Sequence, residues 1–412
     1  MRHALVRLAL AGALLLPLLA AAVDTVRPEV GKPLQAAQEL MKSKRHAEAL
    51  ARIAEADAVP NKTPFETLTV QRMRGTAALA AGQGNVALES FEAALASRLL
   101  PVAEQLTTLQ ALAGLAYRAR DYARAASFAQ RYANQGGSEP SMRMLLAQSH
   151  YLAGAHAEAA RELQAILKAD EQAGRVPSEQ RLQLLANCYA RLDDGPAYQR
   201  VLERLVMHYP KKDYWADLLS RVAQRAGFAG RLSLDVLRLR LATGTLSSEA
   251  DFVEMTQLAL QESSPAEALK IVKRGFAAGA LGSGAQAGRH RRLRDLAAKA
   301  AAEEERSLAN LDGDAATAAA APQGTALFRL GWRLVHHGQA DKGLAMMELG
   351  LQKGGLARPQ DARLHLGVAA LQAGQRSKAA QWLKGVQGSD GTAELARLWL
   401  AHAHGAEARK TP

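Results

Sequence analysis

The histidines of this 412-residue chain do not stand at the spacings that metal or acid–base chemistry needs. His336 and His337 are adjacent, so a helix directs their side chains to different faces. His402 and His404 are two residues apart and diverge in the same way. A helical zinc site instead places its histidines four residues apart on one face. We therefore expect no metal site.

Other residues that could do chemistry have simpler explanations. Asp193 and Asp194 precede a Gly-Pro pair, which is typical of a turn and not of a general acid–base couple. The glycine-rich stretch 279–288 lacks the Lys-Ser/Thr of a phosphate-binding loop and follows no strand. Cys188 lies in an apolar helical pattern with no base suggested nearby, which favours a buried structural residue. The chain is thus predicted to be non-enzymatic, with no catalytic or cofactor-binding residues.

The elements that would position a site follow a repeated spacing, shown best by the stretch GTAALAAGQGNVALESFEAA. Gly75 opens it, Ala87 follows twelve residues later, and Phe91 and Ala94 come next. Two helices joined by a turn at residues 83–85 fit this pattern, because small residues allow close approach and Phe91 falls on the buried face. A hairpin this short cannot bury its own apolar face, so it needs similar neighbours.

The same spacing recurs along the chain. Besides Gly75, the small residue that opens each unit is found at Ala37, Ala113, Ala147, Ala186, Thr256, Gly331 and Gly367. Most intervals are 34 to 39 residues, and the gaps 186–256 and 256–331 each leave room for a degenerate copy. No run alternates like a strand, and aromatic residues make up only 5% of the chain. We expect an all-α solenoid of about nine or ten hairpins forming a curved superhelix.

The first 22 residues have the layout of a secretory signal peptide. Arg2 and Arg7 precede an uncharged apolar run that ends in small residues. The run is about fifteen residues, whereas a membrane span needs about twenty. We expect a cleavable signal; the alternative is retention as an N-terminal inner-membrane anchor.

The rest of the chain divides by composition into four segments. Residues 23–277 are predicted to form an N-terminal repeat array. Residues 278–323 combine a Gly-rich connection, a basic helix and an Ala-rich stretch in one degenerate repeat. Residues 324–404 hold the C-terminal repeats and a closing helix, and residues 405–412 form a loose tail.

Positive charge is in excess, at a formal +12, and one cluster stands out. It consists of Arg289, Arg291, Arg292 and Arg294, with His290 among them. One interpretation is a contact for anionic lipid headgroups or an acidic partner. The other is a solvated helix face, partly neutralised by Asp295 and Glu303–Glu305. Nucleic acid is not expected, since no stacking aromatics interleave with these charges.

The repeat resembles the tetratricopeptide repeat (TPR) family over nearly the whole chain after residue 22. The resemblance rests on the small opening residue, the small residue twelve later, the large residue four beyond it, and Pro210 at the close of one unit. It implies that the first helix of each hairpin lines a concave groove, which holds an extended peptide or another protein.

Groove-facing positions can be assigned by their offsets from each opening residue. The predicted partner-binding residues are Arg72, Thr76, Gln110, Tyr117, Gln148, Tyr151, Gln183 and Asn187. Amides and hydroxyls can bond to a peptide backbone, and tyrosine adds rigid contact area. The alternative is that these are ordinary polar faces of amphipathic helices.

Four phrases also resemble exported TPR proteins that accompany the TonB–ExbB–ExbD system of Gram-negative bacteria. They lie at residues 131–137, 209–215, 289–296 and 366–388. The resemblance implies a periplasmic accessory of energy-coupled uptake, with components of that system as partners. The competing expectation is an envelope-assembly factor for polysaccharide export or outer-membrane protein assembly.

Overall fold

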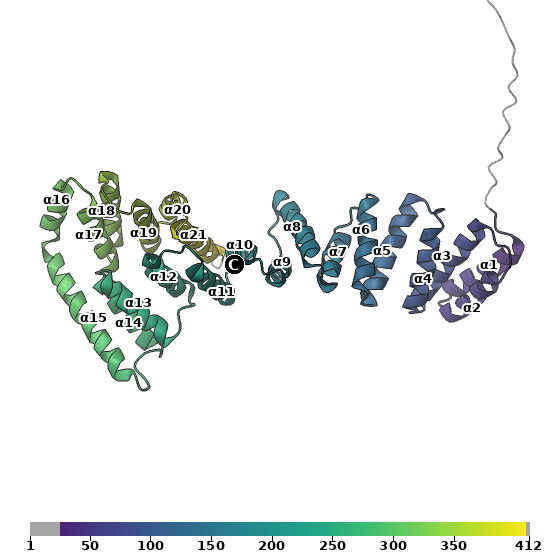
Figure 1. Ribbon diagram of the computed structural model, residues 1–412, viewed down its shortest axis with the longest axis horizontal. Coiled ribbons are helices and arrows are strands. Elements are labelled where there is room, and N and C mark those ends of the chain that lie inside the picture. The colour runs from purple at the N-terminus through teal and green to yellow at the C-terminus, as the bar shows by residue number, and fades with distance from the viewer. Residues whose placement is uncertain (1–24, 409–412) are drawn as a thin grey trace, which may run out of the picture. The chain divides into compact units, whose positions relative to one another are not determined.

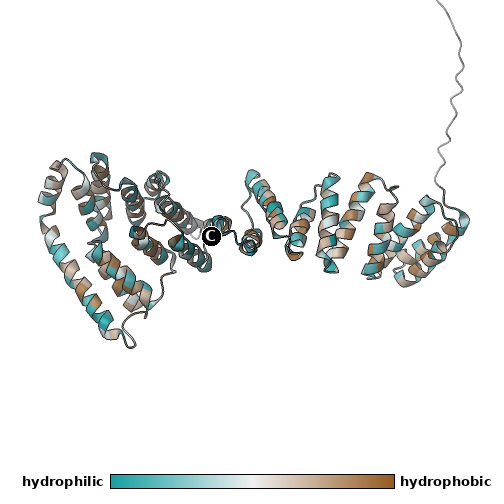
Figure 2. Ribbon diagram, viewed as in Figure 1, coloured by the Kyte–Doolittle hydropathy of each residue, from teal (hydrophilic) through white to brown (hydrophobic). Residues whose placement is uncertain are grey.

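A computed structural model describes residues 25–408, so the expected signal peptide at residues 1–22 lies outside the described part. Within residues 25–408 the chain forms 21 α-helices, two short 3₁₀ helices and no strand (Figure 1). Apolar and polar residues alternate around these helices, as amphipathic packing requires (Figure 2). None of these helices is both long and apolar enough to cross a bilayer. The predicted all-α repeat fold is confirmed.

The chain separates into two compact units, residues 1–162 and 163–412, and the division falls inside helix α8. The four segments predicted from composition, with boundaries at residues 277, 323 and 404, stay predictions. The first unit contains α1 (Pro28–Lys42), α2 (His46–Asp57), α3 (Pro64–Ala80), α4 (Gly84–Ala96), α5 (Val102–Arg118), α6 (Tyr122–Asn134), α7 (Pro140–Leu152) and the start of α8 (His156–Gln172).

The second unit holds the remaining helices. In chain order they are α9 (Glu179–Arg191), α10 (Gly195–His208), α11 (Lys212–Gln224), α12 (Ser233–Thr243), α13 (Glu249–Gln261), α14 (Pro265–Ala277), α15 (Ala287–Ser307), α16 (Leu311–Ala320), α17 (Thr325–His336), α18 (Ala340–Lys353), α19 (Pro359–Gln372), α20 (Arg376–Lys384) and α21 (Thr392–Ala408). The two 3₁₀ turns are η1 (Gly230–Leu232) and η2 (Leu308–Asn310).

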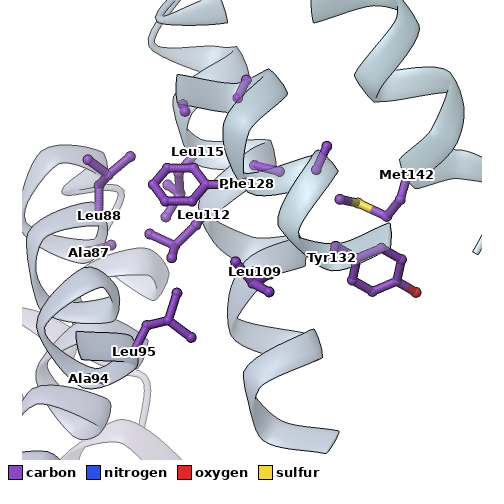
Figure 3. Close-up of a cluster of buried hydrophobic side chains, with 14 of the residues drawn as sticks. Ala87, Leu88, Ala94, Leu95, Leu109, Leu112, Leu115, Phe128, Tyr132 and Met142 are labelled. Atoms are coloured by element: carbon purple, nitrogen blue, oxygen red, sulfur yellow. The ribbon is translucent and has the colours of Figure 1, made fainter. Parts of the chain in front are cut away.

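Small residues hold the hairpins together as the spacing predicted. All eight opening residues, from Ala37 to Gly367, are buried. A Cβ placed on Gly75 would lie 2.7 Å from the ring of Phe91, so α3 and α4 meet through the missing side chain. Larger apolar residues fill the spaces between hairpins, as Leu109, Leu112 and Phe128 do in the first unit (Figure 3). Burial of these faces between neighbours is the main source of stability in such a stack.

The turn between α3 and α4, in the hairpin that opens at Gly75, lies two residues earlier than predicted. Helix α3 ends at Ala80 and α4 already begins at Gly84, so the turn occupies residues 81–83 and not 83–85. Gly82 adopts the left-handed conformation, with φ of 75°, and the Gln83 N–H closes back on the Ala78 carbonyl. Glycine accepts this conformation without a Cβ clash, which is why the reversal falls at that residue.

Both gaps in the repeat are filled by helices. The first holds α11 and α12, which pack on one another as the predicted degenerate copy requires. The second holds α15, a 21-residue helix packed on α14, followed by α16 in the Ala-rich stretch.

The second unit does not remain an open stack. Its last helix, α21, returns to pack against α10, α12, α19 and α20 (Figure 1). Arg231 Nε lies 2.8 Å from Asp361 Oδ2, and its Nη2 lies 2.7 Å from Asp390 Oδ2. Glu394 on α21 accepts from Arg225 Nε at 3.2 Å. The predicted closing helix therefore joins the two ends of this unit.

Candidate functional site

The predicted groove residues of the first unit lie on α3, α5 and α7. Arg72 and Thr76 are exposed on α3, and the rest are half-buried: Gln110, Tyr117, Gln148 and Tyr151. The structure thus leaves all six in reach of water. Whether a partner contacts them stays a prediction.

Several of these polar groups already have partners within the unit. Arg72 Nη2 forms an ion pair of 2.7 Å with Glu104 Oε2 on α5. Gln110 Nε2 donates to the Tyr132 hydroxyl on α6 at 3.2 Å, and Thr76 Oγ1 donates to its own helix. Such groups tie neighbouring helices together, so they offer a partner fewer open hydrogen-bonding positions than the sequence suggested.

The apolar groups at the fourth position after each opening residue form the clearer feature. These are Leu79 on α3, Tyr117 on α5 and Tyr151 on α7, which we call the ladder. Leu79 is 40% exposed. Tyr117 stands edge-on to Tyr122 with ring centroids 5.4 Å apart, and Tyr151 lies 5.3 Å from His156. Each tyrosine is held by the next helix while remaining half-exposed, so its rotamer is fixed in advance of any contact.

The two predicted groove residues of the second unit are Gln183 and Asn187 on α9. Both are exposed. Gln183 Nε2 donates to the Tyr214 hydroxyl on α11, which in turn donates to Glu179. The amide of Gln183 is therefore engaged between repeats.

The basic cluster lies in the first half of α15, and its members are placed differently. Arg289, Arg291 and Arg292 are exposed, and His290 is buried against Glu249. Arg294 pairs with its neighbour Asp295 at 2.9 Å and lies over the ring of Phe276. The predicted basic surface therefore consists of three arginines.

Glu304, one of the acidic residues expected to neutralise this cluster, faces inward. Its carboxylate is buried and binds Arg333 and His337. Glu304 therefore does not offset the charge of the three exposed arginines.

A buried charged cluster in the second unit was not predicted. Arg238 on α12 donates to both carboxylate oxygens of Glu267 on α14, each at 2.7 Å. Its Nη1 donates to Asp235 at 2.8 Å, and Asp235 also lies 3.0 Å from His365 Nε2 on α19. Trp332 on α17 stacks on His365 with centroids 4.8 Å apart. Four helices far apart in sequence meet at this cluster.

Burial and charge shift the titration of the cluster. Burial alone would raise the pKa of Asp235 and of Glu267, but the neighbouring cations outweigh it and hold both below their usual range. Burial lowers the pKa of His336 to about 4, with Glu267 opposing and Arg238 assisting. His336 is therefore neutral at pH 7, and its Nε2 lies 3.6 Å from Glu267 Oε2 without a hydrogen bond.

A sequence signal for this cluster exists. The segment SLDVLRLRLAT of α12 is apolar nearly throughout, yet Asp235 and Arg238 interrupt it. Charges in a helix buried all round must pair internally. Asp235 and Arg238 pair within α12, three residues apart, but their other partners, Glu267 and His365, lie 29 and 130 residues away. Spacing along the chain cannot identify those two.

The histidines and the cysteine behave as their positions imply. His336 faces the buried cluster, whereas His337 Nε2 lies 2.8 Å from Glu304. Cys188 is buried, and burial raises the pKa of its thiol to about 11. Within residues 25–408 no group of three or more His, Cys, Asp or Glu residues is arranged to hold a metal.

Comparison of this chain with known proteins finds similarity only to the folds of solved structures. No protein-family model matches the chain, and no curated protein sequence does either. Among solved structures, a tetratricopeptide repeat protein from Parabacteroides merdae is similar over 65% of this chain and 98% of its own, at 14% identity and a TM-score of 0.32.

Two further solved structures are of the same kind. The C-terminal part of a TPR repeat-containing protein from Cytophaga hutchinsonii covers 62% of this chain and 98% of its own, at 12% identity and a TM-score of 0.30. The TPR2AB domain of yeast Sti1, in complex with pHSP90, covers 75% of this chain and 96% of its own, at 12% identity and a TM-score of 0.25. All three are TPR proteins, and at these scores the likeness carries nothing about what this chain binds.

Proposed function

We propose that this chain is a non-enzymatic protein-interaction scaffold of the periplasm, an accessory of TonB-dependent, energy-coupled uptake. The observation that carries the scaffold role is the ladder. Three consecutive hairpins place a half-exposed or exposed apolar side chain at one equivalent position, and two of the three are tyrosines held by a neighbouring ring. Rigid aromatic groups of this kind are enriched where proteins bind each other.

The proposed location and system rest on sequence features. Residues 1–22 have the arrangement of a secretory signal, and four phrases resemble exported TPR proteins that accompany TonB, ExbB and ExbD. Fractionation of cells that express the full chain tests the location. Recovery of a shortened chain in the periplasmic fraction supports it, whereas a full-length chain in the inner membrane would favour the anchor.

Site-specific photo-crosslinking tests the partner. A photoreactive residue placed at Leu79 should capture a component of the TonB system in envelope extracts. Leu99 is the matched control, because it is 47% exposed and lies between α4 and α5, away from the ladder. Capture of export-synthase or assembly subunits at Leu79 would favour the envelope-assembly function, and equal capture from both positions would remove the ladder as the docking surface.

A further inference from the structure

A cavity of about 500 Å³ opens within the second unit, between α12, α13, α14, α19, α20 and α21. This size is in the range of small-molecule sites. The aliphatic part of its wall comes from two alanines and from Leu241, Met255, Ile271, Val368 and Leu371, and the rest of the lining is charged, polar or ring-bearing. Alkyl side chains of this kind make close dispersion contacts with an alkyl chain.

Buried polar atoms without hydrogen-bond partners also belong to residues that line the cavity. Trp399 is 6% exposed, and its indole Nε1 has no partner among the described residues. His336 is 5% exposed, and its Nε2 likewise forms no hydrogen bond. A buried polar atom left unsatisfied costs stability, so these two atoms beside one cavity indicate a polar group that occupies it, and the Trp399 N–H requires an acceptor.

Cations stand at the same cavity. Lys270 and Arg274 lie one turn apart on α14, line the cavity and are exposed. Neither forms an ion pair with an acidic residue of the described part of the chain. The only carboxylate in the lining, Glu267, is already bound by Arg238 through two hydrogen bonds. The positive charges of Lys270 and Arg274 are therefore available to a ligand that enters the cavity.

We propose that this cavity binds an aliphatic carboxylate, a small organic anion with an alkyl body. The carboxylate oxygens accept from the Lys270 ammonium and from the Trp399 indole N–H, and the alkyl chain packs against the aliphatic part of the wall. Charge-assisted bonds of this kind are stronger than neutral ones, and they set the orientation of the chain. This site is separate from the ladder and does not depend on the function proposed above.

Isothermal titration calorimetry with decanoate tests the site. We expect saturable binding of one decanoate per chain and at least about tenfold weaker binding of decanamide, which keeps the chain and lacks the charge. The double variant Lys270→Gln/Arg274→Gln should weaken decanoate binding by about tenfold or more. Lys273→Gln is the matched control, since Lys273 is exposed on the same helix and does not line the cavity.

A second variant separates loss of the site from loss of the fold. Leu371→Trp should fill the cavity and abolish binding of decanoate while the helical circular dichroism is unchanged. Absence of saturable decanoate binding to the wild-type chain, or equal affinity for decanamide, would overturn the proposal. Decanoate binding that is the same in the Lys270→Gln/Arg274→Gln and wild-type chains would overturn it too.

Discussion

The two units use the same hairpin and stabilise it differently. Among the described residues of the first unit, Glu66 is the single buried Asp, Glu, Lys, Arg or His side chain, and it binds Arg27 from the adjoining hairpin. The second unit buries Asp235, Arg238, Glu267 and His336 in one cluster and closes on itself through α21. Contacts between sequence neighbours are the rule in a solenoid. The second unit departs from that rule, with ion pairs that join residues 130 and 159 positions apart.

This difference has a physical cost and a benefit. A hairpin that meets only its neighbours can be added or lost with local effect, and its outer helices stay free for a partner. Long-range pairing of buried charges fixes one arrangement of several helices, but each charge depends on its partner. The helices of the first unit therefore contact mainly their sequence neighbours, whereas those of the second unit also make long-range contacts and enclose a cavity.

Removal of Arg238 should produce the largest effect. Arg238→Met leaves Glu267 and Asp235 buried without their cation, and we expect a loss of about 3–5 kcal/mol in the free energy of unfolding of the second unit. Lys211→Met, which removes an exposed ion pair with Glu179, should cost under about 1 kcal/mol. Urea titration followed by tryptophan fluorescence measures this, because all four tryptophans lie at or beyond Trp215. Equal losses of unfolding free energy in the Arg238→Met and Lys211→Met variants would show that the buried charged cluster does not stabilise the second unit more than an exposed ion pair does.

Acidification should give the second largest effect, because the two units should lose stability over different pH ranges. His336 has a folded pKa of about 4, below its value of about 6.5 in an unfolded chain, so the unfolded chain takes up the proton first. The second unit should lose about 3 kcal/mol as the pH falls from about 6.5 to 4. In the first unit Arg27 lowers the pKa of Glu66 to about 2, so its loss begins only below about pH 4.5.

His336→Phe tests the assignment of this pH effect. Phenylalanine cannot take up a proton, so most of the fluorescence-detected loss between pH 6.5 and 4 should disappear. His208, whose pKa burial also lowers, accounts for a remainder. A pH profile identical to that of the wild-type chain would contradict the role given to His336.

Two glycines test how closely the helices pack in each unit. A Cβ on Gly343 would lie 2.5 Å from the Gly331 carbonyl oxygen, and backbone cannot move aside. Gly343→Ala should therefore cost about 2 kcal/mol. Gly75→Ala meets only the Phe91 ring and gains helix propensity of about 1 kcal/mol, so its net cost should be under about 1 kcal/mol. Thermal unfolding followed by circular dichroism compares them, and a larger loss for Gly75→Ala would reverse the expectation.

The repeat spacing predicted the hairpins because each opening residue contacts its own hairpin, a local relation that the chain encodes directly. Gly75 with Ala87 and Gly331 with Gly343 are both read from twelve-residue offsets. The return of α21 and the contact of Asp235 with His365 join residues more than one repeat apart, and Glu267 lies 29 residues from Arg238. Nothing in a local pattern says which distant carboxylate neutralises a buried arginine, so that part of the fold could not be predicted.

The positions predicted to face the groove are exposed or half-buried in the first unit, but their offsets could not separate polar groups with structural partners from available ones. Gln110 and Gln183 each bond to a tyrosine of another helix. The offset that selected them also selected Tyr117 and Tyr151, whose rings remain half-exposed. Aromatic and aliphatic positions, more than amides, define the candidate surface of the first unit.

The ladder can be tested by truncation of its tyrosines. Tyr117→Ala with Tyr151→Ala should weaken partner binding by about 30-fold, because each half-exposed ring contributes on the order of 1 kcal/mol at an interface. Helix content should stay the same, since both rings stand at the surface. Gln183→Ala in the second unit is the control. Crosslinking yield at Leu79 measures the effect, and an unchanged yield would remove the tyrosines from the docking surface.

Charge reversal in the second unit should give the smallest effect. Arg291 and Arg292 are exposed on α15 and form no ion pair within the described part of the chain, so Arg291→Glu with Arg292→Glu changes surface potential and not packing. Association with vesicles that contain anionic lipid should weaken a few-fold at low salt, and the difference should vanish near 1 M salt, where the Debye length is about 3 Å. Lys273→Glu with Lys384→Glu gives a control for net charge, since both lysines are exposed and neither lines the cavity. If both pairs weaken association equally, net charge explains it and α15 is an ordinary solvated helix face.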